Sequence, residues 1–206
     1  MPTPTIRLES SSLLLVEGSE EQRFWRVLFR DTAYASVQVL SIGGKDNLSN
    51  VLPVITLTPG FTNVTWLGVM QDADERAGSA FQRICNALDK ARLPVPSQSW
   101  QLTQDATRSV VACVLPDGQS QGDLEELIWR ALETQPATTC ISAYFDCLEN
   151  NGLPLPRQLS KARVHAYLAS FPRPELRLAE AAEAHALPFT LSSPVFDAFR
   201  ALLPSP

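Results

Sequence analysis

Four acidic residues have the types and spacing that suit metal-assisted phosphate chemistry. Glu17 follows one short apolar run, and Glu21 comes four residues later. Asp72 and Asp74 follow a second apolar run and are two residues apart. A short apolar run that stops at an acid is typical of a buried parallel strand with a carboxylate at its carboxyl end. Ligands bind at that edge in open α/β sheets.

If the two strands are neighbours, the four carboxylates converge and repel one another. A divalent cation would relieve this repulsion, and carboxylate oxygens favour Mg²⁺ or Mn²⁺. Alternation along an extended segment is expected to aim Asp72 and Asp74 at one point. Simpler interpretations stay open: Glu17 as an ordinary strand-end residue, Glu21 as a surface-helix glutamate, and 72–74 as an acidic turn.

The elements that must position these acids alternate between strand and helix patterns. This order predicts an α/β fold, with a central, mostly parallel four-stranded sheet wound by right-handed crossovers and flanked by helices. A segment around Ile6 to Leu8 is expected at an edge, and Pro53 is expected to interrupt the second helix. The expected strands are 13–16, 36–42, 66–70 and 109–116, and the expected helices are 19–30, 48–57 and 77–92.

The second half of the chain has helical patterns at 123–133, 138–150 and 159–170, separated by proline-rich connectors. The alanine- and glutamate-rich segment 179–186 is expected to form an exposed helix. We therefore expect residues 1–120 to form the α/β core, and residues 121–206 to form a helical part that completes the same domain.

The length, composition and net charge of the chain limit the classes of protein to which it can belong. The chain has 206 residues, is 45% apolar and 19% charged, and carries a net charge of −5. This suits a soluble globular protein, and no apolar run approaches the roughly 20 residues of a membrane span. Met1 to Thr5 lack the features of a signal peptide, so a cytoplasmic location without membrane contact is expected. The negative charge disfavours non-specific coating of nucleic acid, although unoccupied metal ligands also count as negative.

The four cysteines show no CxxC spacing, and the chain has two histidines. A zinc site is therefore not expected. Cys140 and Cys147 would share one face of a helix but lie too far apart for a disulfide.

Together the acidic elements resemble the Toprim domain of bacterial primases, type IA and type II topoisomerases and OLD-family nucleases. That family has a glutamate and often a glycine after its first strand, as in Glu17-Gly18 here. It has Asp-x-Asp after its third strand, as in Asp72-Ala73-Asp74. The loop 42–47 is similar to a Gly-Lys turn of OLD-like Toprim proteins, and Glu21 also matches the OLD-like variant.

Segments 116–127 and 159–170 are similar to the DUF3226 group, small bacterial Toprim-like proteins of unknown function. This resemblance extends from about Ser12 to Leu202 and implies a Toprim-like (Rossmann-like) fold. The chain has three tyrosines and no large additional domain. Strand passage of the topoisomerase kind is therefore not expected.

The resemblance to OLD-like nucleases implies a two-metal site. Asp72 and Asp74 would bind one Mg²⁺ or Mn²⁺ ion, and Glu17 with Glu21 would bind the other, with Glu17 also acting in catalysis. Glu125 is a candidate further ligand because it opens a helix just after the fourth strand, at the same sheet edge. An exposed glutamate at a helix start is the alternative interpretation.

The resemblance also implies that Lys161 contacts the scissile phosphate and acts in catalysis. His165 lies one turn later on the same helix face and is a candidate for phosphate binding or an ordinary half-buried histidine. Lys45, in a glycine-flanked loop, either meets a phosphate or is solvated. Arg163 belongs to the locally basic segment 157–177, the only stretch expected to contact a nucleic-acid backbone; its other cations are Arg157, Lys161, Arg173 and Arg177.

The leading expectation is a metal-dependent phosphodiesterase or nuclease that acts on nucleic acid in defence or repair. The chain lacks a Gly-x-x-x-x-Gly-Lys-Ser/Thr loop, so any ATPase activity must come from a separate partner. Two alternatives stay open: a phosphoesterase acting on a nucleotide or small phosphate ester, and an inactive Toprim scaffold that binds a protein partner. The oligomeric state is left open.

Overall fold

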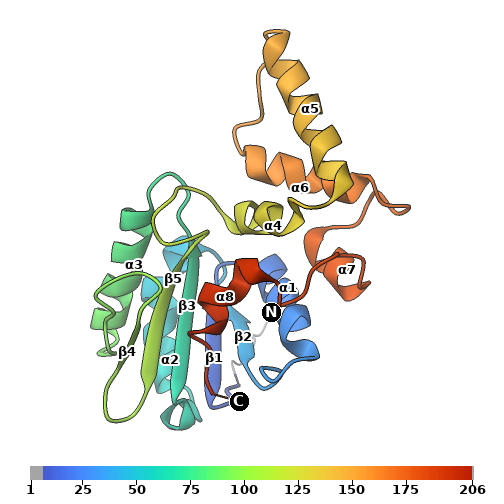
Figure 1. Cartoon of the computed structure of the whole chain (residues 1–206). Coiled ribbons are helices and arrows are strands. Elements are labelled where there is room, and N and C mark those ends of the chain that lie inside the picture. Colours follow the sequence, from blue (N-terminus) through green and yellow to red (C-terminus); the bar gives the residue numbers. More distant parts are fainter. Residues whose placement is uncertain (1–6, 206) are drawn as a thin grey trace, which may run out of the picture.

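The computed structural model describes residues 7–205 and contains a five-stranded sheet in the order β2-β1-β3-β5-β4 (Figure 1). Neighbouring strands are parallel except for β4, which pairs antiparallel with β5. The expectations for Met1 to Thr5 and Ile6 fall outside the described residues, and Arg7 and Leu8 are not in a strand. The strands are β1 (Ser12–Val16), β2 (Gln38–Ser41), β3 (Trp66–Asp72), β4 (Leu102–Gln104) and β5 (Ser109–Leu115).

The predicted α/β class and parallel sheet are confirmed, but the sheet has five strands and not four. The strand that the sequence pattern missed is β4. It has only three residues and no buried side chain, since Leu102 is 42% exposed. A short edge strand of this kind carries no apolar run or alternation that a sequence pattern could detect.

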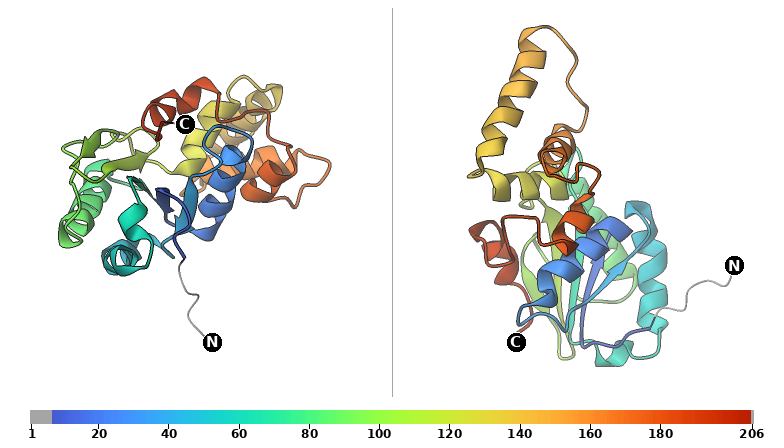
Figure 2. Two further views of the ribbon diagram at one scale, coloured as in Figure 1. Left: turned by 90° about the horizontal axis from the view of Figure 1, so that it is seen from below. Right: turned by 90° about the vertical axis from the view of Figure 1, so that its right-hand side faces the viewer.

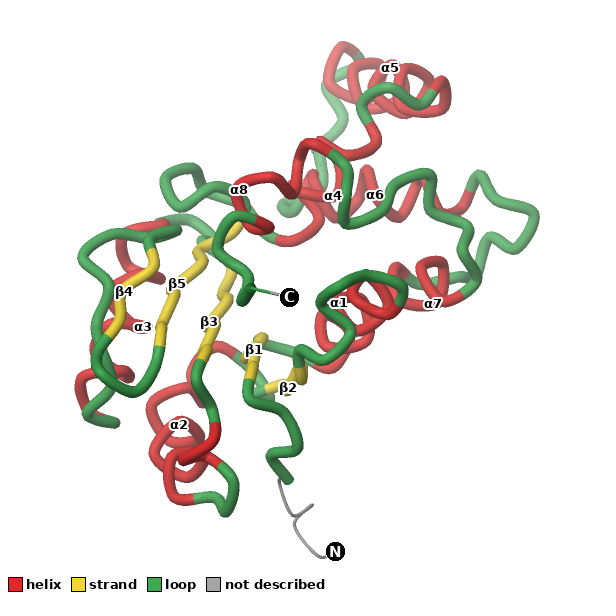
Figure 3. Tube along the Cα trace, turned by 60° about the horizontal axis from the view of Figure 1, so that its bottom comes forward, coloured by secondary structure: helices red, strands yellow, loops and turns green. Residues whose placement is uncertain are grey.

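Helices cover both faces of the sheet (Figures 1 and 3), with α2 and α3 on one side and α1 and α7 on the other. The helices predicted before residue 178 all occur at the expected positions. The helices are α1 (Ser19–Arg30), α2 (Leu48–Leu57), α3 (Ala77–Lys90), α4 (Leu124–Leu132), α5 (Pro136–Asn150), α6 (Leu159–Ala169), α7 (Leu178–Glu183) and α8 (Asp197–Arg200).

Alternation along the strands divides the core into two clusters. Leu13 and Leu15 of β1 face α2 and α3, whereas Leu14 and Val16 face α1 and the C-terminal helices. This follows from the period of two that places successive strand side chains on opposite faces. All four side chains are almost fully buried, so β1 is a fixed support for the residues that follow it.

The C-terminal part packs onto the same face as α1. Trp25 of α1 makes edge contacts with Phe196 and Phe199, whose ring centroids lie 5.9 and 4.9 Å away. The indole Nε1 of Trp66 donates a hydrogen bond to the Leu202 carbonyl over 2.8 Å. Residues beyond 121 thus contribute aromatic side chains to the cluster beneath α1.

The second helix continues through Pro53, contrary to the expected interruption. Proline has no N–H with which to bond the carbonyl four residues earlier, which here is that of Ser49. Lys90 Nζ donates a hydrogen bond to this carbonyl over 3.1 Å. A side chain from α3 therefore replaces the missing backbone donor.

The prediction of an exposed helix at 179–186 is wrong. Ala179 and Ala181 are fully buried, and the helix packs closely against α1 (Figure 2). The N–H of Ala179 donates to Glu20 Oε1 over 3.0 Å, and Arg23 pairs with Glu183 over 2.9 Å. Small alanine side chains allow this close approach, so an alanine-rich segment is here a packing surface.

Helix α5 projects from the body of the molecule and packs on α6 (Figures 1 and 2). Cys140 and Cys147 are exposed on it, and Cys85 and Cys113 are buried; all four are free. Within residues 7–205, no helix is long and apolar enough to cross a membrane.

Candidate functional site

Five acidic side chains gather where β1 and β3 end and where α1 and α4 begin. We call Glu17, Glu21, Asp72, Asp123 and Glu125 the acidic cluster. Glu17 directly follows β1, Asp72 ends β3, and these strands are neighbours in the sheet. The Asp72 N–H donates to Glu17 Oε1 over 3.1 Å, so the two strand ends are joined at the cluster.

The remaining members come from helix starts. Glu21 lies in the first turn of α1, where its carboxylate accepts the Gly18 N–H. Asp123 is the N-cap of α4 and accepts the Glu126 N–H over 2.9 Å. The first turn of α4 also contains Glu125. Acids are favourable at helix N-termini because they accept free N–H groups and face the positive end of the helix dipole.

Asp72 is affected both by burial and by the charges of the other four acids in the cluster. Burial, and then the charges of Glu17, Glu21, Asp123 and Glu125, raises the pKa of Asp72 well above its usual range. Its Oδ1 accepts the Leu124 N–H over 3.0 Å. That one hydrogen bond leaves the repulsion among the carboxylates largely uncompensated.

The pKa values of the glutamates in the cluster are also raised. Burial raises the pKa of Glu17 to about 7, and the negative charges of Glu21 and Asp74 act in the same direction. Burial is also the largest cause of the raised pKa of Glu21 and of Glu125. The structure therefore concentrates negative charge at a place where water can stabilise it only partly.

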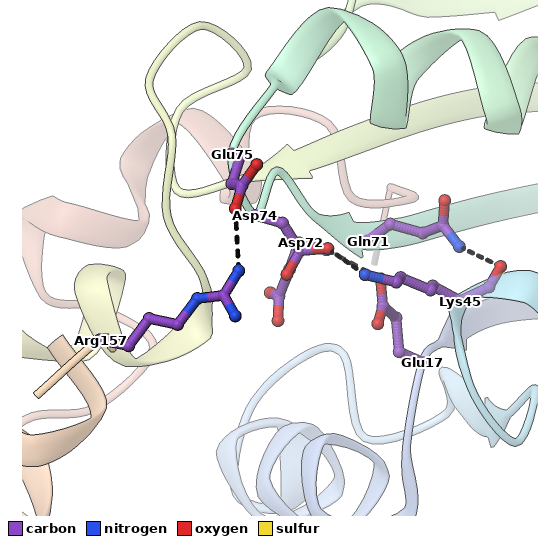
Figure 4. A network of polar contacts seen from close by, with 7 residues as sticks. All are labelled: Glu17, Lys45, Gln71, Asp72, Asp74, Glu75 and Arg157. Atoms are coloured by element: carbon purple, nitrogen blue, oxygen red, sulfur yellow. Dashed lines mark hydrogen bonds and ion pairs between the residues drawn. The ribbon is translucent and has the colours of Figure 1, made fainter. Parts of the chain in front are cut away.

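Asp74 differs from Asp72, and the expected alternation through both residues is wrong. The strand ends at Asp72, and Asp74 has a φ of 51°. Its N–H and C=O both bond to Gly122 over 2.9 Å, which turns the chain away from the strand. The exposed Asp74 carboxylate pairs with Lys45 Nζ over 2.5 Å (Figure 4).

Lys45 is held in place by the loop that follows β2. Gly43 and Gly44 adopt φ values of 77° and 116°, which suit glycine far better than other residues. Gln71 of β3 is 1% exposed, and its Nε2 donates to the Lys45 carbonyl over 3.0 Å (Figure 4). A buried strand residue thus fixes the backbone that carries the lysine.

Lys161 reaches the acidic cluster from α6. Its Nζ lies 3.4 Å from Glu125 Oε1, and the neighbouring Ser160 donates its hydroxyl to Asp123 Oδ1 over 2.9 Å. Burial lowers the pKa of Lys161, but the charges of Glu125, Asp123 and Asp72 outweigh this, so that the pKa is raised overall. Lys161 is therefore a stable cation beside the cluster.

A pocket of about 1230 Å³ adjoins the cluster. It contains all three of the other predicted phosphate-binding residues, Lys45, Arg163 and His165, together with Lys161. Arg157 also lines the pocket and forms an exposed ion pair with Glu75 over 3.2 Å (Figure 4). Basic and acidic side chains line it together. The cations are Lys45, Arg76, Arg83, Arg157, Lys161 and Arg163, and the acids are Asp74, Glu75, Asp123 and Glu126.

The basic segment 157–177 is divided in the structure. Arg173 and Arg177 do not line the pocket. The backbone N–H of Arg177 donates to Glu180 Oε2 over 3.0 Å at the start of α7. The part of this segment that adjoins the acidic cluster is therefore the start of α6 and the loop before it.

The donor set suits a hard divalent cation, because it consists of carboxylate oxygens that carry more negative charge than nearby cations neutralise. Glu17, Glu21, Asp72 and Glu125 could supply such oxygens, with Asp74 at the margin. Over residues 7–205, no three Asp, Glu, His or Cys side chains stand at the spacing of a formed metal site.

Several site residues were missed from the sequence. Asp123 and Ser160 join α4 to α6 within the cluster, and Gln71 and Arg83 lie near or at the pocket. The signal for Asp123 was present, since an aspartate before a helix pattern is a typical N-cap. Gln71 and Arg83 carry no such local signal.

The family described as "Protein of unknown function (DUF3226)" matches residues 11–204. Among solved structures, the C-terminal region of the Xanthomonas campestris pv. campestris OLD protein is 16% identical, with coverage of 97% of this chain and 88% of that one and a TM-score of 0.38. The C-terminal region of the Burkholderia pseudomallei OLD protein is 17% identical, with coverage of 95% and 88% and a TM-score of 0.37. No curated protein matches the chain.

Proposed function

The chain belongs to the DUF3226 family, as its sequence suggested, and we propose that it is a metal-dependent phosphodiesterase that acts on nucleic acid. One observation carries this proposal: a cluster of mutually repelling carboxylates lies beside a pocket lined by several cations. Carboxylates suit divalent metal ions, and cations suit the phosphates of the substrate.

Glu17, Glu21, Asp72 and Glu125, with Asp74, would hold one or two Mg²⁺ or Mn²⁺ ions. Such ions stabilise the negative charge that develops on phosphoryl oxygens and lower the pKa of bound water. Because the pKa of Glu17 is about 7 without an ion, metal binding near neutral pH would release a proton from this carboxyl group.

Lys161 would bind a non-bridging oxygen of the scissile phosphate. It is a stable cation, and its contact with Glu125 keeps its Nζ beside the acids. Ser160 and Asp123 hold the start of α6 against α4, so the lysine has a fixed position. A preorganised cation of this kind stabilises developing charge without reorganisation during the reaction.

Nucleic acid is the proposed substrate because the cations extend beyond the acidic cluster into the pocket. His165 and Arg163 on α6 would add to the attraction of a phosphate backbone. If ATP hydrolysis accompanies the reaction, a separate ATPase partner would supply it. A role in defence or repair would fit such a pair of proteins.

The test is an assay with single-stranded, duplex and supercoiled DNA and with RNA, in EDTA, Mg²⁺ or Mn²⁺. Asp72→Asn keeps the size of the partly buried side chain but removes its charge, and Asp146→Asn on exposed α5 is the matched control. We expect cleavage that needs the metal, is lost in Asp72→Asn and is retained in Asp146→Asn.

Small phosphate esters and nucleotides belong in the same assay. Hydrolysis of these compounds without cleavage of nucleic acid would replace the proposal with a phosphoesterase. If folded protein shows no hydrolysis and no Mg²⁺ or Mn²⁺ binding by calorimetry, the proposal fails and a binding scaffold becomes the better account.

A further inference from the structure

The pocket has a second group of cations on elements other than α6. Arg83 lies on α3 and Arg76 immediately precedes this helix, and both line the pocket together with Lys45 of the loop after β2. We call Lys45, Arg76 and Arg83 the cationic wall.

Arg83 lacks the partners that a half-buried guanidinium normally has. Within residues 7–205 it forms no ion pair, and its Nε and Nη2 are buried with no hydrogen-bond partner. Buried polar groups are nearly always hydrogen-bonded, and an unpaired charge is costly to desolvate. Arg83 lines the pocket, so an anion that enters there would give this guanidinium the charge partner that it lacks.

Lys45 and Arg83 line the same pocket. Lys45 Nζ pairs with Asp74 Oδ2 over 2.5 Å. Asp74 thus neutralises one member of the wall and leaves Arg83 unneutralised. Two like charges that line one pocket form a site for an anion.

We propose that the cationic wall binds a second phosphate of the substrate, apart from the phosphate that meets the acidic cluster and Lys161. A ligand that fills both places carries at least two phosphates, joined by a flexible backbone. A nucleic-acid strand, whose successive phosphates can reach both places, fits this arrangement, whereas a nucleoside monophosphate or a simple phosphate ester has one phosphate and can fill only one of them. This identification of the ligand rests on the proposed function, whereas anion binding by Arg83 can be tested without catalysis.

The binding experiment uses the full chain, a fluorescently labelled 12-nucleotide single-stranded DNA, and EDTA to prevent cleavage. The variants are Arg83→Gln, Arg83→Lys and the control Arg30→Gln, which removes an exposed arginine from the far end of α1. Circular dichroism establishes that each variant is folded.

We expect Arg83→Gln to weaken binding about tenfold, the usual effect of one lost charge-assisted hydrogen bond. It should also reduce the slope of log affinity against log salt by about 0.7, as one single-strand phosphate contact would. Arg83→Lys should retain part of the affinity and the full slope, and Arg30→Gln should match the wild type. Equal affinities of Arg83→Gln and Arg30→Gln, or no binding by the wild type, would overturn the proposal.

A second measurement separates the two proposals. Arg83→Gln should lower kcat/KM about tenfold for the 12-nucleotide strand but leave bis(p-nitrophenyl) phosphate, which has one phosphate, unaffected. An equal loss on both substrates would show that Arg83 acts on the reaction centre and not at a second subsite. If no substrate is cleaved but Arg83→Gln still weakens binding, the subsite stands and the phosphodiesterase proposal fails.

Discussion

The acidic cluster and the cationic wall adjoin the same pocket, but their charges are held differently. The acids sit on strand ends and first turns of helices, where burial raises their pKa values. The wall comes from a loop, from the N-cap of α3 and from α3 itself, where the half-buried Arg83 has no ion-pair partner within residues 7–205. Lys45 of the wall forms an ion pair with Asp74, which lies outside the acidic cluster.

This difference indicates that ion pairs within the protein do not account for where the acidic cluster and Arg83 lie. A protein stabilised by these residues alone would pair the surplus acids with the surplus arginines, because unpaired half-buried charges are unfavourable. Within residues 7–205, Arg83 forms no ion pair with the acidic cluster, which leaves one place suited to cations and another suited to anions. The separation fits a metal ion and a phosphate chain that meet in the pocket, as we propose.

The largest expected effect on catalysis comes from removing Lys161, the cation beside the acidic cluster. Lys161→Met should lower kcat for nucleic-acid cleavage by about 10²–10³, as the loss of one group that stabilises developing charge commonly does. KM should change less than kcat. Steady-state kinetics beside the control Arg173→Gln, which lies outside the pocket, measures the difference. A rise in KM alone would move Lys161 from the reaction centre to the binding surface.

The acidic cluster should also respond to pH and to metal removal. Folding raises the Glu17 pKa from an ordinary value of about 4.3 to about 7, so the folded state binds this proton more tightly than the unfolded state. Its contribution to stability is therefore greatest below pH 4 and is lost as the pH rises through 7. Discounted for partial exposure to solvent, the loss is on the order of 1–2 kcal/mol.

Thermal unfolding in EDTA measures this effect. The Tm of Glu17→Gln relative to that of the wild type should be higher at pH 7.5 than at pH 5. Added Mg²⁺ should raise the Tm of the wild type at pH 7.5, because an ion that binds only the folded state stabilises it. A difference between the two proteins that does not vary with pH would mean that Glu17 titrates normally.

A smaller effect is expected from changing Gln71, whose side chain holds the backbone of Lys45 in place. Gln71→Leu removes the hydrogen bond to the Lys45 carbonyl, but it also removes a buried Oε1 that has no partner. The free energy of unfolding should therefore change by less than about 1 kcal/mol, while the KM for an oligonucleotide rises a few-fold as the loop loosens. Chemical denaturation and kinetics test both, with Gln101→Leu at an exposed position as control.

The smallest effect is expected at the exposed rim of the pocket. Arg157 and Glu75 pair over 3.2 Å with both side chains largely in water, and such pairs contribute little. Glu75→Gln should shift Tm by less than about 1 °C and leave cleavage unchanged. A clear loss of activity would extend the functional site beyond the acidic cluster and the cationic wall.

The sequence predicted the strand-end acids at one sheet edge, but it did not single out Arg83. Glu17 and Asp72 end apolar runs whose length and composition are typical of buried parallel strands, and this local pattern also predicted their place at one sheet edge. Arg83 lies within an ordinary amphipathic helix. Its pocket is formed by the loop after β2, the turn at Gly122 and α6, which are far apart in the chain.

Predictions from local sequence patterns were also wrong where a contact with a distant part of the chain determined the structure. Pro53 does not break its helix, because Lys90 supplies a donor to Ser49. The alanines of α7 are buried because α1 covers them. The edge strand β4 exists because β5 offers it hydrogen bonds, and not because of its own side chains.

The sequence by itself determined the α/β class, the positions of most helices and strands, and the strand-end acids, because hydrophobic periodicity and capping act over a few residues. Only the tertiary structure decided that Asp72 is partly buried among other acids while Asp74 pairs with Lys45. It also decided that Ser160 and Asp123 bring Lys161 to the acids, and that Arg83 has no acidic partner within residues 7–205. These outcomes depend on burial and on charges from distant segments, which set pKa values and pairing through space and not along the chain.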